Sequence, residues 1–321
     1  MLIIKQCKCF FILFFGITIL PSLSYAYPVF AQKSYPSNPR EISGKIICAN
    51  CHLEEKKIKT EIPRTILPDS VFEIAVSIPY DTTITQLAAD GGPTYILVGS
   101  VLILPEGFQL APENRLIRKQ KDYVNNNYIQ PYNSEKKNIL LAGPIQPDDD
   151  DKKTKFIFPI LSPNLTQKNQ SKFLNYKVSV GLNIGRGQVY PTGEKSNNNM
   201  IFSNVTGRVL SVEWKLSRRR KSIIRKKVIL NETVSGGVKV QSIPAELSIT
   251  VDKRDFITFG DPLTLDPNQG GFGQAKVGLV LQNSKRIQAM IIFFFTVTIA
   301  QILLVIKKKQ FEKVQLSEIN F

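Results

Sequence analysis

The chain has 321 residues, a hydrophobic fraction of 43% and a formal net charge of +16. This length exceeds one minimal domain and corresponds to about two domains, with enough apolar residues to build a core. The large positive charge favours an acidic protein, an anionic membrane surface or nucleic acid as a partner. Four cysteines in a chain of this length exclude a disulfide-based scaffold.

Residues 1–26 have the composition of a signal peptide. Two lysines precede an apolar run over residues 10–20, and Ser24-Tyr25-Ala26 closes the segment with small residues two positions apart. A basic start, an apolar stretch and a small-x-small site are the features of a secretory signal. We predict cleavage after residue 26, which also removes Cys7 and Cys9. A retained N-terminal anchor is the alternative.

Cys48-Ala49-Asn50-Cys51-His52 is the strongest chemical motif of the chain. C-x-x-C-H is the attachment pattern of a c-type haem, in which Cys48 and Cys51 bind the haem covalently and His52 ligates the iron. A thioredoxin-like dithiol is an alternative, but no βαβ pattern surrounds the motif. A zinc site is another, but His52 is the only histidine, so a carboxylate or water would have to complete the ligands. We predict one covalently bound haem c.

Between the haem motif and residue 285 the sequence has the pattern of short β-strands. Runs of β-branched and apolar residues end at Gly, Pro or Asn, as in antiparallel sandwiches and barrels. No long amphipathic helical stretch interrupts them. The predicted strands cover residues 71–80, 95–104, 155–161, 176–184, 205–216, 223–230, 245–251 and 277–281.

A dense group of cations lies in the second half of this β region. It begins with four consecutive basic residues, Arg218, Arg219, Arg220 and Lys221, and continues at residues 225–227. Nucleic-acid binding is one interpretation of such a run, but an exported, membrane-tethered haem protein rarely meets nucleic acid. We predict instead a solvated strand edge or a docking surface for a protein partner, and no nucleic acid as a partner.

The C-terminal region contains one candidate membrane span. Residues 286–306 begin with a single arginine and are then almost wholly apolar, and Lys307-Lys308-Lys309 follows them. At about 1.5 Å per residue, such a helix crosses a hydrocarbon core of about 30 Å. The lysines predict that residues 307–321 stay on the side of synthesis, so that the bulk of the protein is exported and tethered by one helix.

Composition does not fix the second axial ligand of the iron. With a single histidine, two histidine ligands from one chain are impossible. Methionine is the usual second choice, and only Met200 lies outside the signal peptide and the span, in a polar run. The α-amine of Tyr27, freed by cleavage, has an ordinary pKa of about 7.7–8.0 and is more easily neutral than a lysine amine. Tyr27, Met200, a lysine and an open site remain as alternatives.

Longer motifs are spread along the whole chain beyond the haem site. They cover residues 27–32, 38–41, 48–53, 67–69, 71–73, 78–81, 102–108, 185–191, 270–274 and 307–318. Over residues 27–321 these segments resemble the cytochrome f family, the c-type haem subunits of the cytochrome b6f complex. The last segment, in the C-terminal tail, is the most specific of them.

The resemblance implies a mainly β fold, with an elongated large β-sandwich haem domain, a small inserted β domain and one C-terminal transmembrane helix. The implied division is a signal peptide at 1–26, a large domain at 27–198 and 267–285, a small domain at 199–266, a transmembrane helix at 286–306 and a tail at 307–321.

The resemblance also implies the site residues around the haem. The α-amine of Tyr27 would be the sixth ligand, which requires cleavage after Ala26 because an acylated nitrogen cannot ligate iron in this way. Tyr27, Pro28 and Phe30 would shield the haem. A buried water chain would be lined by amide side chains, namely Gln86, Asn183, Gln188, Asn198 and Asn268.

The function implied by the resemblance is electron transport without bond-making chemistry of its own. The protein would take an electron from the Rieske iron–sulfur protein and pass it to plastocyanin or a soluble c-type cytochrome. The other partners would be cytochrome b6, subunit IV and the small subunits of the complex. The location would be the thylakoid membrane, with the haem domain in the lumen and the C-terminus in the stroma. Abundant Lys, Asn and Ile favour a plastid over a cyanobacterial source.

One departure from the family concerns docking. Family members of plants and green algae present lysines to acidic plastocyanin, and the positions that match three of these lysines are Thr85, Gly92 and Pro93 here. Docking then relies on a relocated basic patch, or the soluble partner is less acidic.

Two rival functions belong to other classes. A membrane-tethered haem sensor with a labile sixth site would bind carbon monoxide readily when reduced. A β-sandwich adhesion module with an incidental C-x-x-C-H would carry no covalent haem.

Overall fold

Strands dominate the structure, a computed structural model that describes residues 29–78, 84–147, 155–164, 174–216, 223–234 and 236–319. The strands are β1 (Lys59–Glu61), β2 (Thr65–Ile66), β3 (Val71–Ser77), β4 (Thr85–Leu87), β5 (Pro93–Tyr95), β6 (Val98–Ile103), β7 (Gln109–Leu110), β8 (Gln130–Pro131), β9 (Ile139–Ile145), β10 (Lys155–Leu161), β11 (Leu174–Ile184), β12 (Gly207–Leu216), β13 (Ile223–Glu232), β14 (Val238–Pro244), β15 (Phe256–Ile257) and β16 (Gly271–Leu281). The helices are α2 (Val29–Ser34), η1 (Ile47–Asn50), η2 (Glu113–Arg115), α3 (Arg118–Asn126) and α4 (Ser284–Ile319).

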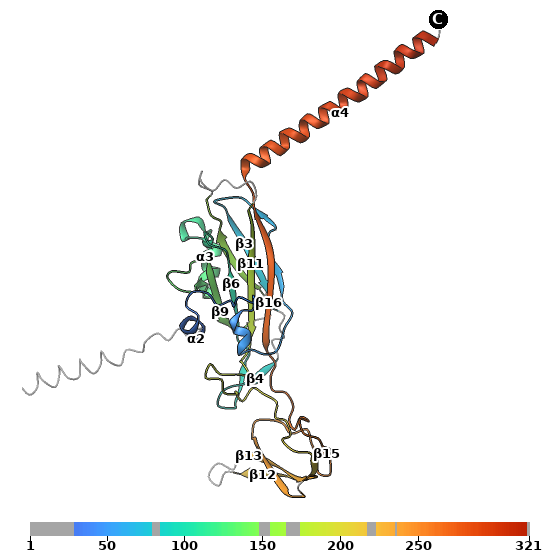
Figure 1. Cartoon of the computed structure of the whole chain (residues 1–321). Helices are drawn as coiled ribbons and strands as arrows, with labels where there is room; N and C mark the ends of the chain where they lie inside the picture. The colour runs from blue at the N-terminus through green and yellow to red at the C-terminus, as the bar shows by residue number, and fades with distance from the viewer. Residues whose placement is uncertain are drawn as a thin grey trace, which may run out of the picture.

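Two sheets face each other and form the largest body of the molecule (Figure 1). One has four strands in the order β1-β3-β10-β7, and the other has six in the order β2-β16-β11-β6-β9-β8. Strands β3 and β10 pair antiparallel and send Ile74, Val76, Phe156 and Phe158 into the core between the sheets. These side chains alternate along their strands because successive residues of a strand point to opposite faces. The predicted mainly β fold is confirmed.

The six-stranded sheet is covered on its outer face as well. Every residue of β6 is buried, as are all residues of β9 except Pro144. A second apolar cluster lies on the outer face, and Cys48 and Ala49 pack against it. Two-sided burial explains why β6 and β9 are almost continuously apolar instead of alternating. The members of this outer cluster are Ile46, Val101, Ile103, Tyr132, Ile139, Leu141 and Phe272.

Gly181 of β11 leaves room for the outer cluster. A Cβ at this position would lie 2.7 Å from Phe272, 2.8 Å from Val101 and 3.1 Å from Ile46. We expect Gly181→Ala to lower the free energy of unfolding by about 1–3 kcal/mol, because the added methyl overpacks the layer beneath the haem motif. Denaturant titration of the purified protein measures this change.

The matched control for this prediction is Gly278→Ala in the neighbouring strand β16. An added Cβ there meets only Asn175 Oδ1, at 3.6 Å, so the free energy of unfolding should change by no more than about 0.5 kcal/mol. Equal losses in the two variants would contradict the close packing assigned to Gly181.

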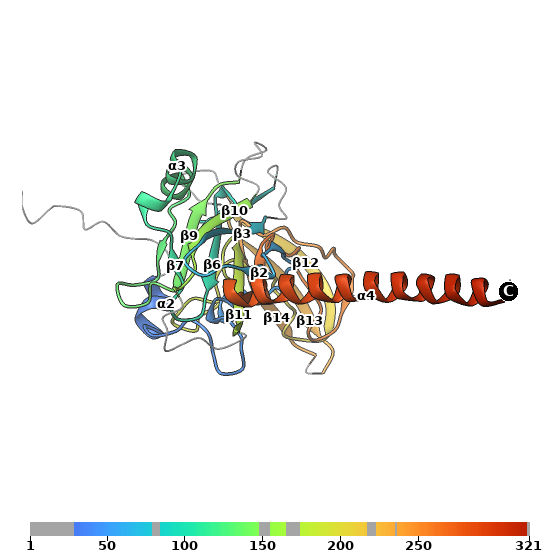
Figure 2. The same ribbon diagram turned by 90° about the horizontal axis from the view of Figure 1, so that it is seen from above.

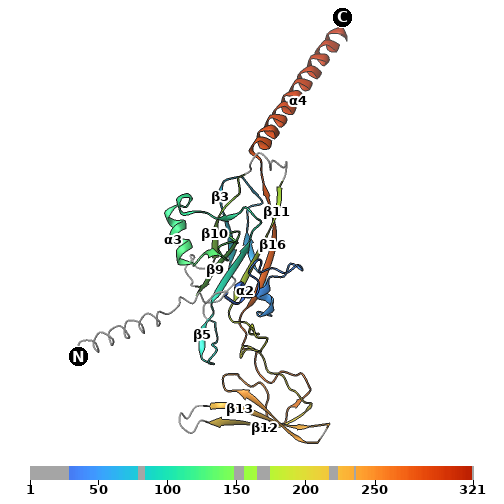
Figure 3. The same cartoon turned by 60° about the vertical axis from the view of Figure 1, so that its left-hand side comes forward.

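A third sheet, with the order β14-β13-β12-β15, lies at the opposite end of the two-sheet body from α4 (Figure 3). It has its own core, and Leu87 of the β4–β5 hairpin packs against that core. Gly91 in the hairpin turn lies against the side chain of Glu246. The hairpin therefore contacts the third sheet directly. The core consists of Val209, Val228, Leu230, Ile243, Leu247, Ile257 and Leu263.

Two expectations about this third sheet are wrong. Residues 245–251 form a turn and an isolated bridge between Ile249 and Thr264, and the strand is β14, which ends at Pro244. Lys226 of the basic group is buried instead of solvated. Its Nζ donates to Leu247 O at 2.6 Å and lies 5.3 Å from the centroid of the Trp214 ring, so the apolar stem fills the core while the ammonium finds an acceptor.

Helix α4 leaves the end of β16 and projects well beyond the strands (Figure 2). It has 36 residues, and its most apolar window has a mean hydropathy of 2.6 with none of it buried. By length and composition it is a candidate membrane span. The predicted span, residues 286–306, lies inside it, and the helix continues through Lys307-Lys308-Lys309 to Ile319.

Candidate functional site

The C-x-x-C-H motif consists of the short helix η1 and the two residues after it. Backbone hydrogen bonds fix its shape: Cys51 N and His52 N both donate to Cys48 O, at 3.2 and 3.0 Å. Ile47 N donates to Pro39 O at 2.9 Å, which ties the start of η1 to the preceding loop. One turn of chain therefore presents both thiols, with the imidazole directly after them.

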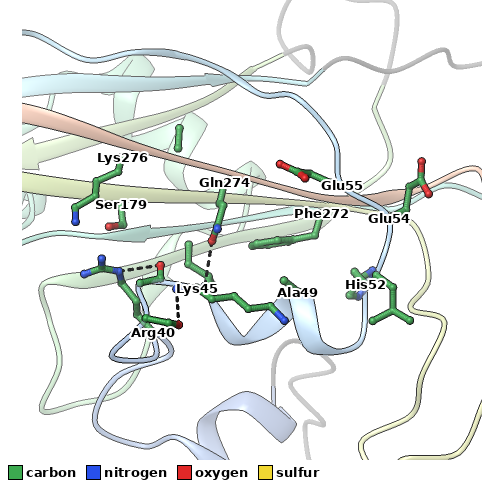
Figure 4. A pocket seen from close by; sticks show the side chains of 15 residues that line it. Arg40, Lys45, Ala49, His52, Glu54, Glu55, Ser179, Phe272, Gln274 and Lys276 are labelled. Carbon is green, nitrogen blue, oxygen red and sulfur yellow. Dashed lines mark hydrogen bonds between the residues drawn. The ribbon is translucent and has the colours of Figure 1, made fainter.

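This turn is attached to the outer face of the six-stranded sheet. Ile46 N donates to Gln274 Oε1 of β16 at 3.1 Å, and Phe272 of the same strand packs in the cluster against Cys48 and Ala49. Figure 4 shows Phe272 lying between the strands and the turn. The sheet thus forms a rigid floor under the motif.

A groove of about 760 Å³ runs between the turn and β16. Ala49 and His52 line it from the turn, and Phe272 and Gln274 line it from the strand (Figure 4). His52 lies near the end that carries Glu54 and Glu55, whereas Arg40 and Lys276 line the other end (Figure 4). The His52 imidazole therefore lines an open groove on one side, while protein atoms bury most of the rest of the ring.

Burial controls the protonation of the motif side chains. It raises the pKa of Cys48 to about 11, raises the pKa of Cys51, and lowers the pKa of His52 to about 4. Both thiols are free, and His52 Nδ1 is buried with no hydrogen-bond partner among the described residues. A neutral imidazole beside two free thiols fits the c-type haem that the motif predicts. Among the described residues, no group of three or more His, Cys, Asp or Glu side chains is placed to hold a metal ion.

The loop after β11 fastens the motif from a second side. Gln188 N donates to Cys51 O at 2.7 Å, and Gln188 Oε1 accepts from Leu53 N at 2.8 Å. Gly187 lies so close to the motif that a Cβ there would be 2.9 Å from Cys51 O. The segment 185–191 is therefore part of the site, although its residues do not carry the chemistry of the motif.

Four of the five amides predicted to line a water chain form one network: three contact the backbone of Arg186, and Asn268 joins through Asn198. Gln86 Oε1 accepts from Arg186 N at 2.9 Å, and Asn198 Nδ2 donates to Arg186 O at 2.9 Å and to Asn268 Oδ1 at 3.2 Å. Gln188 Nε2 also faces Arg186 O, at 3.5 Å. The network therefore starts at the haem motif, through Gln188, and extends away from it.

The fifth amide, Asn183, lies half-buried in β11 and is not hydrogen-bonded to the other four. Its Oδ1 and that of Asn198 are buried without a partner among the described residues. Buried acceptors of this kind in polar surroundings are typical water-binding groups.

The remaining predicted residues are spread over the molecule. Phe30 in α2 is 65% exposed. Met200 is half-buried and precedes Ile201, which packs against the core of the third sheet. Thr85 and Pro93 are exposed in the β4–β5 hairpin, which also contains Gly92. Six predicted site residues lie outside the described residues: Tyr27, Pro28, Arg218, Arg219, Arg220 and Lys221.

Sequence reasoning missed two residues beside the site. Arg186 holds the amide network with its backbone, and its Nη1 donates to Leu87 O at 2.6 Å and to Asn197 Oδ1 at 2.7 Å. Tyr132 is 1% exposed in the outer cluster, against which Cys48 packs. Arg186 stood inside a recognised motif, but nothing in the local sequence distinguished Tyr132 from the other tyrosines.

Comparison with known proteins supplies the family. The family described as Apocytochrome F, N-terminal matches residues 27–185, and Apocytochrome F, C-terminal matches residues 197–321. Cytochrome f of Emiliania huxleyi is 47% identical over 306 residues, which cover 95% of each chain. Cytochrome f of Gracilaria tenuistipitata var. liui is 48% identical over 303 residues, or 94% of each chain, and that of Zygnema circumcarinatum is 46% identical over 306 residues, covering 95% of this chain and 92% of the relative. The chain belongs to the cytochrome f family.

Proposed function

We propose that this protein is the membrane-anchored electron carrier of a cytochrome b6f complex and has no bond-making chemistry of its own. One covalently bound haem c would supply a one-electron Fe(III)/Fe(II) couple. The observation that carries this proposal is the C-x-x-C-H turn, where two free thiols adjoin an imidazole whose buried Nδ1 has no partner among the described residues. Family membership supports the same reading.

In this proposal Cys48 and Cys51 hold the haem through thioethers, and His52 is the proximal ligand. The α-amine of Tyr27 fills the second axial position after cleavage, and Pro28 and Phe30 shield the haem. The family match that begins at residue 27 supports this choice of mature N-terminus. Two protein ligands leave no position for oxygen or a substrate, which suits electron transfer.

The amide network would hold the water chain expected for the family. Gln188 contacts the haem motif at Cys51 O and the residue after it at Leu53 N, and Asn198 joins the network to Asn268. The two unpaired buried oxygens, Asn183 Oδ1 and Asn198 Oδ1, would accept hydrogen bonds from water. These oxygens would determine where water binds, and the backbone N and O of Arg186 would hold Gln86 and Asn198 in position.

The electron would arrive from the Rieske iron–sulfur protein and leave to plastocyanin or a soluble c-type cytochrome. Helix α4 would span the thylakoid membrane once, beside cytochrome b6, subunit IV and the small subunits, with the haem domain in the lumen and the tail in the stroma.

The separate cores of the two-sheet body and of the third sheet support a division into a large domain (27–198 and 267–285) and a small domain (199–266).

We expect the reduced protein to be low-spin and to form no rapid carbon monoxide adduct, because an imidazole and an amine occupy both axial positions and carbon monoxide can enter only as the amine is slowly released. Visible spectra of the purified, reduced full-length protein before and after addition of carbon monoxide test this directly. A rapidly formed carbon monoxide adduct would overturn the carrier assignment and favour the haem sensor.

The rate at which the protein reduces an acidic soluble acceptor should fall by about tenfold or more from low to physiological ionic strength, because charge drives the encounter. Replacing Arg218, Arg219, Arg220 and Lys221 together by neutral residues should flatten this dependence. The control replaces three cations of α3, namely Arg118, Lys119 and Lys121. An unchanged salt dependence in the first variant would exclude residues 218–221 as the docking site.

A further inference from the structure

The segment that follows the proposed N-terminus is fastened to residues 132 and 133. The hydroxyl of Tyr132 donates to Tyr35 O at 3.0 Å, and Asn133 Nδ2 donates to Pro36 O at 2.7 Å. Gln32 Nε2 of helix α2 donates back to the backbone oxygen of Tyr132. Three hydrogen bonds therefore join two stretches of chain that are about a hundred residues apart in sequence.

Burial and hydrogen bonds hold Tyr132 and Asn133 in place. Tyr132 is 1% exposed, and its backbone N donates to Ile139 O at 2.7 Å, directly after the pairing of β8 with β9. Asn133 Oδ1 accepts from Glu135 N and Lys136 N at 3.1 and 2.7 Å, which fixes the orientation of its side chain. The N-terminal segment is thus attached to the start of the loop that directly follows β8, the edge strand of the six-stranded sheet.

Tyr132 also belongs to the outer cluster against which the haem motif packs. It shares that cluster with Ile46 and Phe272, and Cys48 and Ala49 pack against it. Burial raises the pKa of Tyr132 to about 12, so its hydroxyl remains a donor at physiological pH. One side chain therefore connects the turn that carries the thiols with the segment that leads back to Tyr27.

We propose that Tyr132, assisted by Asn133, is a positioning residue that holds the N-terminal segment so that its free α-amine reaches the iron. The inference rests on the proposed ligation by Tyr27. Gln32 lies five residues after Tyr27, and Tyr35 directly follows helix α2. Since a chain spans at most about 3.3–3.6 Å per residue, the bond of Gln32 confines the amine to within about 18 Å of it, and the bond from the Tyr132 hydroxyl to Tyr35 O holds the other end of α2. Removing the Tyr132 hydroxyl frees Tyr35 O, which loosens the C-terminal end of α2 and lowers the effective concentration of the amine at the iron.

The test is Tyr132→Phe in the full-length haem-loaded protein, since this change removes the hydroxyl and keeps the ring in the cluster. Hydrogen exchange of the backbone amides in residues 30–36 should become about three- to tenfold faster, as expected for the loss of one partly buried hydrogen bond. In the reduced protein, carbon monoxide should bind about three- to tenfold faster than in the wild type, because release of the amine limits its binding.

Tyr123→Phe is the matched control. The hydroxyl of Tyr123 also donates to a backbone oxygen, that of Lys155, and burial also raises its pKa to about 12, but it links α3 to β10 instead of the N-terminal segment. This variant should leave both the exchange of residues 30–36 and the carbon monoxide rate unchanged. Equal effects of the two substitutions would show general loosening and overturn the inference.

The remaining outcomes separate this inference from the proposed ligation. If the wild type resists carbon monoxide and Tyr132→Phe resists it equally, with unchanged exchange, Tyr132 is not a positioning residue while ligation by Tyr27 still stands. If the wild type itself binds carbon monoxide readily, the amine ligation is wrong, and the inference that rests on it falls with it.

Discussion

The double variant Cys48→Ser, Cys51→Ser is expected to lose all covalently bound haem. A serine hydroxyl cannot replace the thiol in a thioether, and the two cysteines are the only ones outside the predicted signal peptide. Haem staining of the membrane fraction after denaturing electrophoresis should show a haem-bearing band for the wild type and none for the variant. Each single variant retains one thiol and should keep at most one thioether.

The control for this prediction lies in the same chain. Cys7 and Cys9 fall within residues 1–26, so Cys7→Ser together with Cys9→Ser should leave the haem stain unchanged. A stained band in the double variant of the motif would contradict covalent attachment at Cys48 and Cys51. Loss of stain in the Cys7 and Cys9 variant would instead place those thiols in the mature protein.

A mature chain that starts one residue earlier should lose its sixth ligand. With one alanine added before Tyr27 and retained after cleavage, the nitrogen of Tyr27 becomes an amide, and the free amine moves by about 3.8 Å along the chain. An amide nitrogen does not ligate iron as a neutral amine does. We expect the reduced variant to bind carbon monoxide at least about tenfold faster, because the displaced amine has a lower effective concentration at the iron.

The retained residue is verified by the mass of the purified chain before the spectra are compared. Phe30→Ala is the control, since it removes a predicted shielding side chain but leaves the amine in place, and its change in carbon monoxide rate should be smaller. An extended chain that stays low-spin and inert to carbon monoxide would show that the ligand is not the terminal amine.

The fold class was predictable from sequence because the core strands follow simple periodicity. Phe156, Phe158 and Ile160 are buried at every second position of residues 155–161, and β10 has those same bounds. The predicted strand at 245–251 was wrong because pairing with a neighbouring strand, and not hydrophobicity, determines which residues form β14. Val238 and Val240 are exposed in β14, which forms by pairing with β13, whereas the apolar run at 245–251 turns inward after Pro244.

Short helices were the other elements that the sequence did not reveal. Helix α3 has nine polar-rich residues, and only Tyr123 and Val124 pack against the core. Its first turn begins where Ile117 N donates to Gln120 Oε1. A pattern of two apolar contacts is too sparse to predict a helix from periodicity.

The candidate haem residues can be proposed from the sequence, but the residues that support them cannot. The spacing of Cys48, Cys51 and His52 is local, so the sequence alone indicates their role. Tyr132 and Gln274 reach the motif or its neighbours only through tertiary packing, and neither belongs to a local pattern of metal or haem ligands. The burial of Lys226 could not be predicted from sequence for the same reason, since its acceptor is the backbone oxygen of Leu247, 21 residues away.

We infer that proteolysis after Ala26 completes the haem site. The most direct test is the intact mass of the denatured mature protein, combined with sequencing of its N-terminus. The account predicts a chain of residues 27–321 with a free amine at Tyr27 and the added mass of one haem c. A chain that starts at any other residue, an acylated N-terminus, or a mass without haem would contradict it.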